Sequence, residues 1–208
     1  MSGLRRIRAI FNRQVKDTLK NKTVLIQFIM FPVLTVIMAS AVDLGDMPEN
    51  FFVNLFATMY IGMAPLTSMA TIMSEEKEKN TLRVLLMSNV NAFEYLIGVG
   101  LYIVILCAAG SCIIASQGHF NGREFAIFVG IMLIGILIST VIGAVIGILS
   151  KNQMSATSLS VPLMMIFAFL PMIASFNKSV GKVSKFIYSQ QIDNLIEKWV
   201  ERQQAVKV

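Results

Sequence analysis

Ser74–Gly100, with the sequence SEEKEKNTLRVLLMSNVNAFEYLIGVG, is the stretch that decides the fold of this chain. It is the one long charged interruption between segments that are otherwise almost wholly apolar, because one uncharged run ends at Met73 and another begins at Tyr95. Apolar runs on both sides of a short charged segment are typical of two membrane-spanning helices joined outside the lipid. The stretch therefore predicts a membrane protein and marks the connection between two of its spans.

The charged stretch contains a short predicted helix with two faces. Leu82, Leu85 and Leu86 fall at helical spacing on one side, and Arg83 falls on another. Thr81 is expected to act as its N-cap, because a hydroxyl accepts hydrogen bonds from the unpaired amides of a first turn. A helix at the exit of two membrane spans is well placed to be pushed by a protein outside the membrane.

The amino-acid composition excludes most soluble classes of protein. Of the 208 residues, 55% are apolar and 14% are charged, whereas soluble proteins average about 25% charged residues. The net charge of +6 does not indicate nucleic-acid binding, because the basic residues flank apolar runs, as in membrane proteins. The length predicts one transmembrane domain over 1–208, with an interfacial helix over 1–22, spanning helices over 23–176 and a helical tail over 177–208.

Five uncharged runs of 20 to 25 residues follow the N-terminal segment. They are Thr23–Val42, Phe51–Met73, Tyr95–Gln117, Phe125–Leu149 and Met154–Phe176. A helix needs about 20 residues to cross the hydrocarbon core, and it satisfies its own backbone there. We therefore expect an all-α membrane protein, a bundle with five visible spanning helices.

Prolines interrupt three of the apolar runs. Kinks or breaks are expected at Pro32, Pro65, Pro162 and Pro171, because proline removes one backbone hydrogen bond from a helix. The last run holds two of these prolines, so its second half has an alternative, which is to turn back instead of crossing.

The N-terminal segment Met1–Lys22 carries seven basic residues and one acidic residue, Asp17. Its apolar residues recur three and four positions apart, which predicts an amphipathic helix. Such a helix lies in the lipid headgroup layer and binds anionic lipids through its lysines and arginines. A cleaved signal peptide fits poorly, because the basic region is too long and no small-residue cleavage site follows.

The C-terminal segment Asn177–Val208 carries six basic residues. Ile192, Leu195, Ile196 and Trp199 share one helical face, which predicts a second interfacial amphipathic helix.

Lysine and arginine residues are distributed unevenly among the connections. Their bias places Met1–Lys22 and Ser74–Glu94 in the cytoplasm, and Asp43–Asn50 and Gly118–Glu124 outside. After five spans the basic tail would lie outside, which conflicts with its charge. Three explanations compete: a sixth span follows in the natural protein, the fifth run is re-entrant, or the rule fails here. We favour the sixth span.

The sequence offers no chemistry for a reaction of its own. None of the five apolar runs contains a charged residue or a histidine, which argues against proton coupling. The phosphate-binding pattern GxxxxGK[ST] is missing, since Gly181-Lys182 is followed by Val183. We therefore predict no catalytic residue and no metal or cofactor bound by this chain.

Three glycines of the fourth apolar run form a predicted helix-packing seam. Gly135, Gly143 and Gly147 lack side chains, and small residues let membrane helices approach closely. The seam serves either packing inside the chain or contact with another subunit.

The central stretch resembles the permeases of type-2 ATP-binding-cassette exporters. In that family, the cytoplasmic end of the second span carries a charged run, a Gly-Thr-Leu step, two leucines and a Ser/Thr-Pro-Val/Ile step into the third span. The matching residues here are Glu76–Lys79, Thr81-Leu82, Leu85-Leu86, Ser88 with Val90, and Gly98 soon after the third span begins. Asn80 and Asn89 stand where glycine and proline are usual, and asparagine also tolerates the left-handed backbone conformation.

The resemblance implies a permease subunit in a bacterial cytoplasmic membrane, with its N-terminus in the cytoplasm. Two copies, or this chain and a close homologue, would pair and recruit two copies of a separate ATPase, which would bind ATP and Mg. The cargo would leave the cell between the permeases, and a charge-free path suits an amphipathic or hydrophobic cargo such as an antimicrobial or toxin peptide or a drug. The expected ATPase-coupling surface consists of Glu75, Glu76, Glu78, Asn80, Thr81, Leu82, Leu85, Leu86 and Ser88.

Two other classes of protein are alternatives. A non-transporting membrane scaffold or immunity protein would bind no ATPase. An intramembrane enzyme would need a polar catalytic cluster, which the sequence does not offer. An ATPase gene beside this one would favour export.

Overall fold

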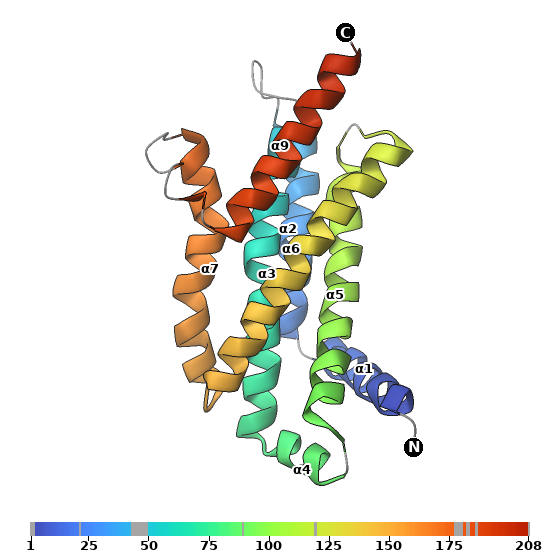
Figure 1. Cartoon of the computed structure of the whole chain (residues 1–208), viewed down its shortest axis with the longest axis vertical. Helices are drawn as coiled ribbons and strands as arrows, with labels where there is room; N and C mark the ends of the chain where they lie inside the picture. The colour runs from blue at the N-terminus through green and yellow to red at the C-terminus, as the bar shows by residue number, and fades with distance from the viewer. Residues whose placement is uncertain are drawn as a thin grey trace.

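The structure is a computed structural model, and it describes residues 3–20, 22–42, 50–88, 90–118, 120–176, 181, 184, 185 and 187–207. Within this part of the chain all regular structure is helical, as the sequence predicted. The helices are α1 (Gly3–Lys20), α2 (Lys22–Ala41), α3 (Phe51–Glu78), α4 (Thr81–Met87), α5 (Ala92–Ser116), α6 (Gly122–Leu149), α7 (Gln153–Phe176) and α9 (Tyr188–Lys207). The long helices run along one axis, with α1 and α4 at one end, called the α4 end, and the C-terminal part of α9 at the other, called the α9 end (Figure 1).

Four helices are long and apolar enough to cross a membrane, namely α3, α5, α6 and the part of α7 from Gln153 to Ala174. The first of the five predicted spans appears only as a shorter apolar helix, Leu25–Ala41, within the described residues. The structure therefore supports four of the five predicted spans. The remaining one, the first in the chain, lies in α2, which begins at Lys22, but the apolar helix counted there is only Leu25–Ala41.

The prolines do not break their helices. The three helices α2, α3 and α7 continue through Pro32, Pro65, Pro162 and Pro171. Of the expected kinks or breaks, the breaks are wrong, because a helix that loses a single backbone hydrogen bond keeps the others, and the kinks stay a prediction. The alternative in which the last run turns back is not what the structure shows, since α7 is one continuous helix along the long axis (Figure 1).

Helix α3 is the centre of the bundle. In its apolar part 78% of the residues are buried, against 22% for α7. The largest fully buried side chains include Tyr60, Ile61, Leu66 and Met69, all from α3. The other described helices pack around α3, so its position sets theirs.

The three glycines of the predicted seam all face α3. A Cβ on Gly135 would lie 2.6 Å from the Ile61 side chain, and a Cβ on Gly147 would lie 2.8 Å from that of Met73. At Gly143 an added Cβ would overlap the backbone carbonyl of α3 itself. Of the two uses left open by the sequence, the structure places this seam inside the chain.

A fourth glycine, Gly62 of α3 itself, lets α7 approach another part of α3. A Cβ on Gly62 would lie 2.9 Å from the backbone nitrogen of Ala168 and 2.9 Å from the carbonyl of Phe167. Because the obstacle is backbone, which cannot rotate away as a side chain does, only glycine fits at this crossing.

Helix α9 packs into the bundle through the predicted apolar face. Ile192 and Ile196 are buried, and Trp199 contacts Phe120, but Leu195 is 50% exposed and lies off this face. Three of the four residues that the sequence placed on this face therefore pack against the bundle, and Leu195 does not.

Polar contacts hold the first turns of α9. The Thr58 hydroxyl of α3 donates to the Asp193 carboxylate at 2.9 Å, and the hydroxyls of Ser139 and Tyr188 are hydrogen-bonded at 2.7 Å. Buried polar groups cost free energy unless they are hydrogen-bonded, so such pairs specify where a helix sits. Part of the tail expected at the membrane surface is thus anchored inside the bundle.

Helices α5 and α6 begin in the same way. The carboxylate of Glu94 accepts a hydrogen bond from the backbone amide of Asn91 at 2.9 Å, and that of Glu124 accepts one from the amide of Asn121 at 2.8 Å. In each case a glutamate three residues into the helix reaches back to the residue before it, which is a capping box. Both helices therefore start three residues earlier than the uncharged runs suggested.

Replacing Gly143 with alanine should destabilise the bundle, because the new methyl group meets the backbone of α3. Overpacking of this kind costs about 1–3 kcal/mol. Gly130 lies on the same helix with nothing within 4 Å of its added Cβ, so Gly130→Ala is the matched control. Thermal unfolding in detergent should show a lower melting temperature for Gly143→Ala alone. Equal melting temperatures would show that α3 and α6 are not as close as described.

Candidate coupling site at the end of the central helix

The charged run of the central stretch is helical and belongs to α3. Sequence reasoning placed Ser74–Glu78 in a connection outside the membrane, whereas α3 continues without a break to Glu78. The connection to α4 is then only Lys79 and Asn80. The side chains of Glu75, Glu76, Lys77 and Glu78 therefore lie on the last turn of the most buried helix, and Lys79 follows it directly.

Asn80 makes the turn between α3 and α4. Its φ of 56° and ψ of 11° are left-handed, and it is the single non-glycine residue with positive φ in the described part of the chain. The sequence interpretation of Asn80 as a left-handed residue in place of glycine is confirmed. The expected capping role of Thr81 is wrong, because its hydroxyl donates to the Glu76 carbonyl at 3.1 Å and does not accept from α4.

Helix α4 turns two of its predicted contact residues inward. Leu82 and Leu85 are half-buried and pack on the core of the bundle, whereas Leu86 is 43% exposed. Ser88 is exposed and its hydroxyl donates to the Leu85 carbonyl at 2.7 Å. Thus only part of the expected leucine face is open to another protein.

The exposed side of α4 carries apolar residues that sequence reasoning missed. Val84 is 66% exposed and Met87 is 79% exposed. Phe93, in the first turn of α5, is 70% exposed. Val84 and Met87 are three residues apart, which is helical spacing, so this second apolar pair was visible in the sequence. We call Val84, Leu86 and Met87 the α4 patch.

Glu75 and Lys79 form an exposed pair on successive turns. The Lys79 ammonium donates to the Glu75 carboxylate at 2.5 Å. This hydrogen bond, with the charge of Glu75, raises the pKa of Lys79 above its usual value. The pair joins residues of α3 and its end only, so it holds no other helix.

Glu76 is buried and joins α3 to α1. Its Oε1 accepts a hydrogen bond from Gln14 Nε2 at 2.6 Å and forms an ion pair with Arg13 Nη2 at 3.6 Å. The residue is only 6% exposed, so it does not belong to a surface that another protein can reach. Its expected place on the coupling surface is therefore not what the structure shows.

A second ion pair joins α1 to the start of α5. Arg6 Nη1 lies 3.3 Å from Glu94 Oε2, and Ile10 packs against Gly98, where an added Cβ would lie 2.8 Å away. Glu76 and Glu94 stand on the two sides of α4 in the sequence. Helix α1 thus contacts both helices from which the α4 connection emerges.

Lys77 and Glu78 contact the remaining two helices at the α4 end. Lys77 Nζ donates to the carbonyls of Gly147, Ile148 and Ser150 at 2.9, 2.5 and 3.1 Å. Glu78 Oε2 accepts from the amide of Gln153 at 2.9 Å. Glu76, Lys77 and Glu78 therefore bind other helices of the same chain. The sequence analysis predicted none of these contacts.

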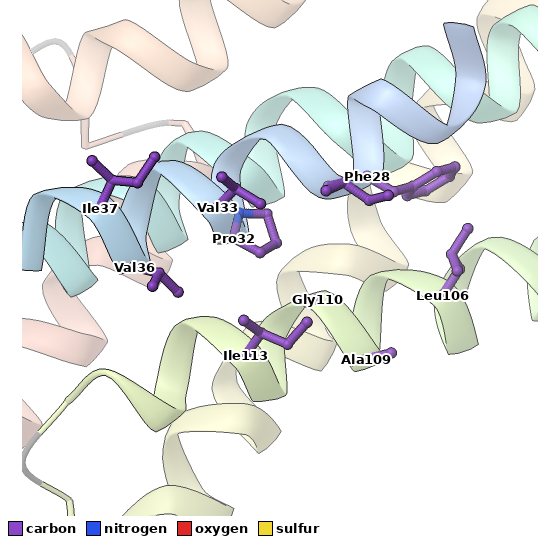
Figure 2. A pocket seen from close by; sticks show the side chains of 10 residues that line it. Phe28, Pro32, Val33, Val36, Ile37, Leu106, Ala109, Gly110 and Ile113 are labelled. Carbon is purple, nitrogen blue, oxygen red and sulfur yellow. The ribbon is translucent and has the colours of Figure 1, made fainter. Parts of the chain in front are cut away.

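A wholly apolar groove lies between α2 and α5, far from this charged run. Its volume is about 270 Å³, and Figure 2 shows its lining from the two helices. The lining residues are Phe28, Ile29, Pro32, Val33, Val36 and Ile37 on α2, and Leu106, Ala109, Gly110 and Ile113 on α5. Gly110 forms part of its floor, because a Cβ there would touch the Tyr60 hydroxyl of α3. Such a lining fits a hydrocarbon or another apolar helix and offers no chemistry for a reaction.

Among the residues that the structure describes, no group of histidine, cysteine, aspartate and glutamate side chains is placed to hold a metal. Asn89, which departs from the family pattern, and His119 lie outside the described residues. The site at the α4 end thus consists of a small apolar patch on a short helix and of charges that hold the helices behind it.

This arrangement defines a polytopic helical membrane protein that presents a short helix at one end of its bundle. The model of the ABC-2 family of transporter proteins matches residues 8–196. The chain therefore belongs to the ABC-2 transporter family, and it is a permease subunit. Membership of this family implies association with an ABC ATPase. No curated protein and no solved structure is similar enough to match the chain.

Replacing Asn80 tests the left-handed turn. Asn80→Val should lower the free energy of unfolding by about 1–2 kcal/mol, because a β-branched residue is strained at positive φ. Asn80→Gly, the control, should retain or raise it, since glycine adopts this conformation freely. Thermal unfolding of the two variants in detergent measures the difference. A valine variant as stable as the glycine variant would contradict the described turn.

Proposed function

We propose that this chain is the permease subunit of an ATP-driven exporter of amphipathic or hydrophobic cargo. The family supports a permease, and the sequence has no phosphate-binding loop, so the energy would come from ATP hydrolysed by a separate subunit. The observation that carries the proposal is the exposed α4 patch, an apolar surface on a short helix joined directly to the central helix.

The α4 patch is the proposed docking surface for the ATPase. Val84, Leu86 and Met87 belong to α4, which lies at one extreme of the bundle (Figure 1). Exposed Arg83 lies beside them. Burying an apolar side chain of this size contributes roughly 1.5–3 kcal/mol, so the patch is sufficient to dominate the affinity. The charged run, which is occupied with other helices, contributes mainly by holding the patch in place.

The proposed orientation puts the α4 end in the cytoplasm of a bacterial cell. Basic residues of α1 lie at this end, and Arg5 and Arg8 are exposed, as a helix on anionic lipid requires. In this proposal α2 is the first of five spans, and α9 begins within the bundle and reaches the outer side.

Two copies of the chain, or one copy with a close homologue, are proposed to pair and to move the cargo between them. The exposed surfaces of the spanning helices are apolar, and the groove between α2 and α5 has the same character. This chemistry supports a hydrophobic or amphipathic cargo, with antimicrobial or toxin peptides as the first class to test.

The docking proposal predicts that Met87→Asp releases the ATPase. Co-expression with an ABC ATPase that co-purifies with the unchanged chain, followed by affinity purification in mild detergent, should show a loss of about ten-fold or more in bound ATPase, as expected for one buried apolar side chain. Leu85→Asp is a poorer probe, because Leu85 packs on the bundle and its replacement also disturbs folding.

Leu195→Asp serves as the matched control. Leu195 is 50% exposed on α9 and is far along the chain from α4, so its change should leave the bound ATPase unchanged. A folded Met87→Asp protein with a full complement of ATPase would contradict the docking surface. No ATPase bound to the unchanged chain would instead favour a non-transporting scaffold.

The orientation predicts which positions an impermeant thiol reagent can reach. In a background without Cys107 and Cys112, Arg83→Cys should be labelled only after the cells are permeabilised, and Arg123→Cys should be labelled on intact cells. Both positions are exposed in the structure. Labelling of position 83 from outside intact cells would reverse the proposed orientation.

A further inference from the structure

Three consecutive charged residues at the end of α3 contact three different helices. Glu76 contacts α1, Lys77 contacts α6 and Glu78 contacts α7. Successive side chains of an α-helix point about 100° apart, so three in a row face three directions. The end of α3 is thus joined to three of the helices around it through adjacent residues.

Lys77 binds the C-terminal end of α6. The last carbonyls of a helix lack amide partners and carry partial negative charge, which favours a cation. The Lys77 ammonium donates to three such carbonyls, those of Gly147, Ile148 and Ser150. Since each bond involves a charged donor, the contact is stronger than a neutral hydrogen bond.

Glu78 binds the N-terminal end of α7. Its carboxylate accepts a hydrogen bond from the amide of Gln153, the first residue of the helix. Free amides at a helix start carry partial positive charge, which favours an anion. Lys77 and Glu78 therefore hold both sides of the turn that connects α6 and α7, each with the charge that its helix end prefers.

The same end of α3 carries α4 on a connection of two residues. Asn80 gives this connection one fixed left-handed conformation, and the Thr81 hydroxyl donates to the Glu76 carbonyl one turn back. A displacement of α4 is therefore expected to move the end of α3 with it, as in rigid-body movements of packed helices.

We propose that Lys77 and Glu78 are positioning residues that transmit the movement of α4 to the α6–α7 hairpin. This inference rests on the proposed function, because it takes the push on α4 to come from a docked ATPase. When α4 moves, α3 moves with it, and the two charges draw the ends of α6 and α7 along. The permease then responds through three spanning helices and not through α3 alone.

The experiment measures hydrogen–deuterium exchange of the full chain with its ATPase in lipid nanodiscs, without nucleotide and with ATP plus vanadate. Peptides over residues 81–88 report docking, and peptides over residues 148–155 report the hairpin turn. In the unchanged protein, the ATPase should protect 81–88, and nucleotide should change exchange at 148–155 by about two-fold or more, since local opening energies set exchange rates.

The test variant carries Lys77→Met and Glu78→Gln, which removes one positive and one negative charge. It should keep the docking protection at 81–88 and lose the nucleotide response at 148–155. The matched control carries Glu75→Gln and Lys79→Met, which also removes one charge of each sign from the same run but breaks only the exposed pair. This control should keep the nucleotide response at 148–155.

Two further variants separate transmission from a purely structural role. Lys77→Arg keeps a cation with several donors and should retain the response. If the double variant does not yield folded protein, Glu78→Gln alone, an isosteric change of an exposed side chain, should show a partial loss.

The outcomes distinguish the two proposals. Missing protection at 81–88 in the unchanged protein would overturn ATPase docking, and transmission with it. Protection at 81–88 with no nucleotide response at 148–155, or with a response that persists in the folded test variant, would overturn transmission while docking stands.

Discussion

The structure depends on how closely the other helices approach α3. In a bilayer the lipid is as apolar as the side chains, so helices associate through close packing and not through the removal of apolar surface from water. Gly143 and Gly147 bring α6 onto one part of α3, and Gly62 lets the α7 backbone approach another. At each of these glycines, the backbone lies against the backbone or the Cβ atom of a residue on the neighbouring helix. The burial of α3 and the placement of α4 at its end follow from this packing.

Charges at the α4 end complete what packing begins. A buried carboxylate such as Glu76 is tolerable only with partners, and α1 supplies two of them, Gln14 and Arg13. Lys77 satisfies carbonyls that α6 cannot satisfy by itself. The run that looks like a protein-binding surface in the sequence is therefore largely internal, and the α4 patch is the surface proposed for binding. A membrane transporter gains from this division, because the groups that hold helices together are separate from those that meet a partner.

Much of the fold was predictable from the sequence, and the reasons are local. Apolar runs of sufficient length identified α3, α5, α6 and α7, and the left-handed turn at Asn80 followed from the tolerance of asparagine for positive φ. The position of α4 in the chain was predictable, but the face that it turns toward the bundle was not. Which face of α4 turns inward depends on the helices behind it, so Leu82 and Leu85 could not be told from Leu86 by spacing. Gln14, which donates to Glu76, lies 62 residues away from it in the sequence, and no local pattern encodes such a contact.

The capping boxes at the starts of α5 and α6 fix where each helix begins relative to its apolar run. Helix α5 has 25 residues between the Asn91 cap and the last turn, a length of about 37 Å, whereas the hydrocarbon core measures about 30 Å. Asn91 and Asn121 cap helices that begin at opposite ends of the bundle (Figure 1), and each cap lies outside the uncharged run that follows it. Each cap is made by residues only three apart, so it needs no contact from another helix. The starts of α5 and α6 are thus specified within one helical turn, independently of the packing around α3.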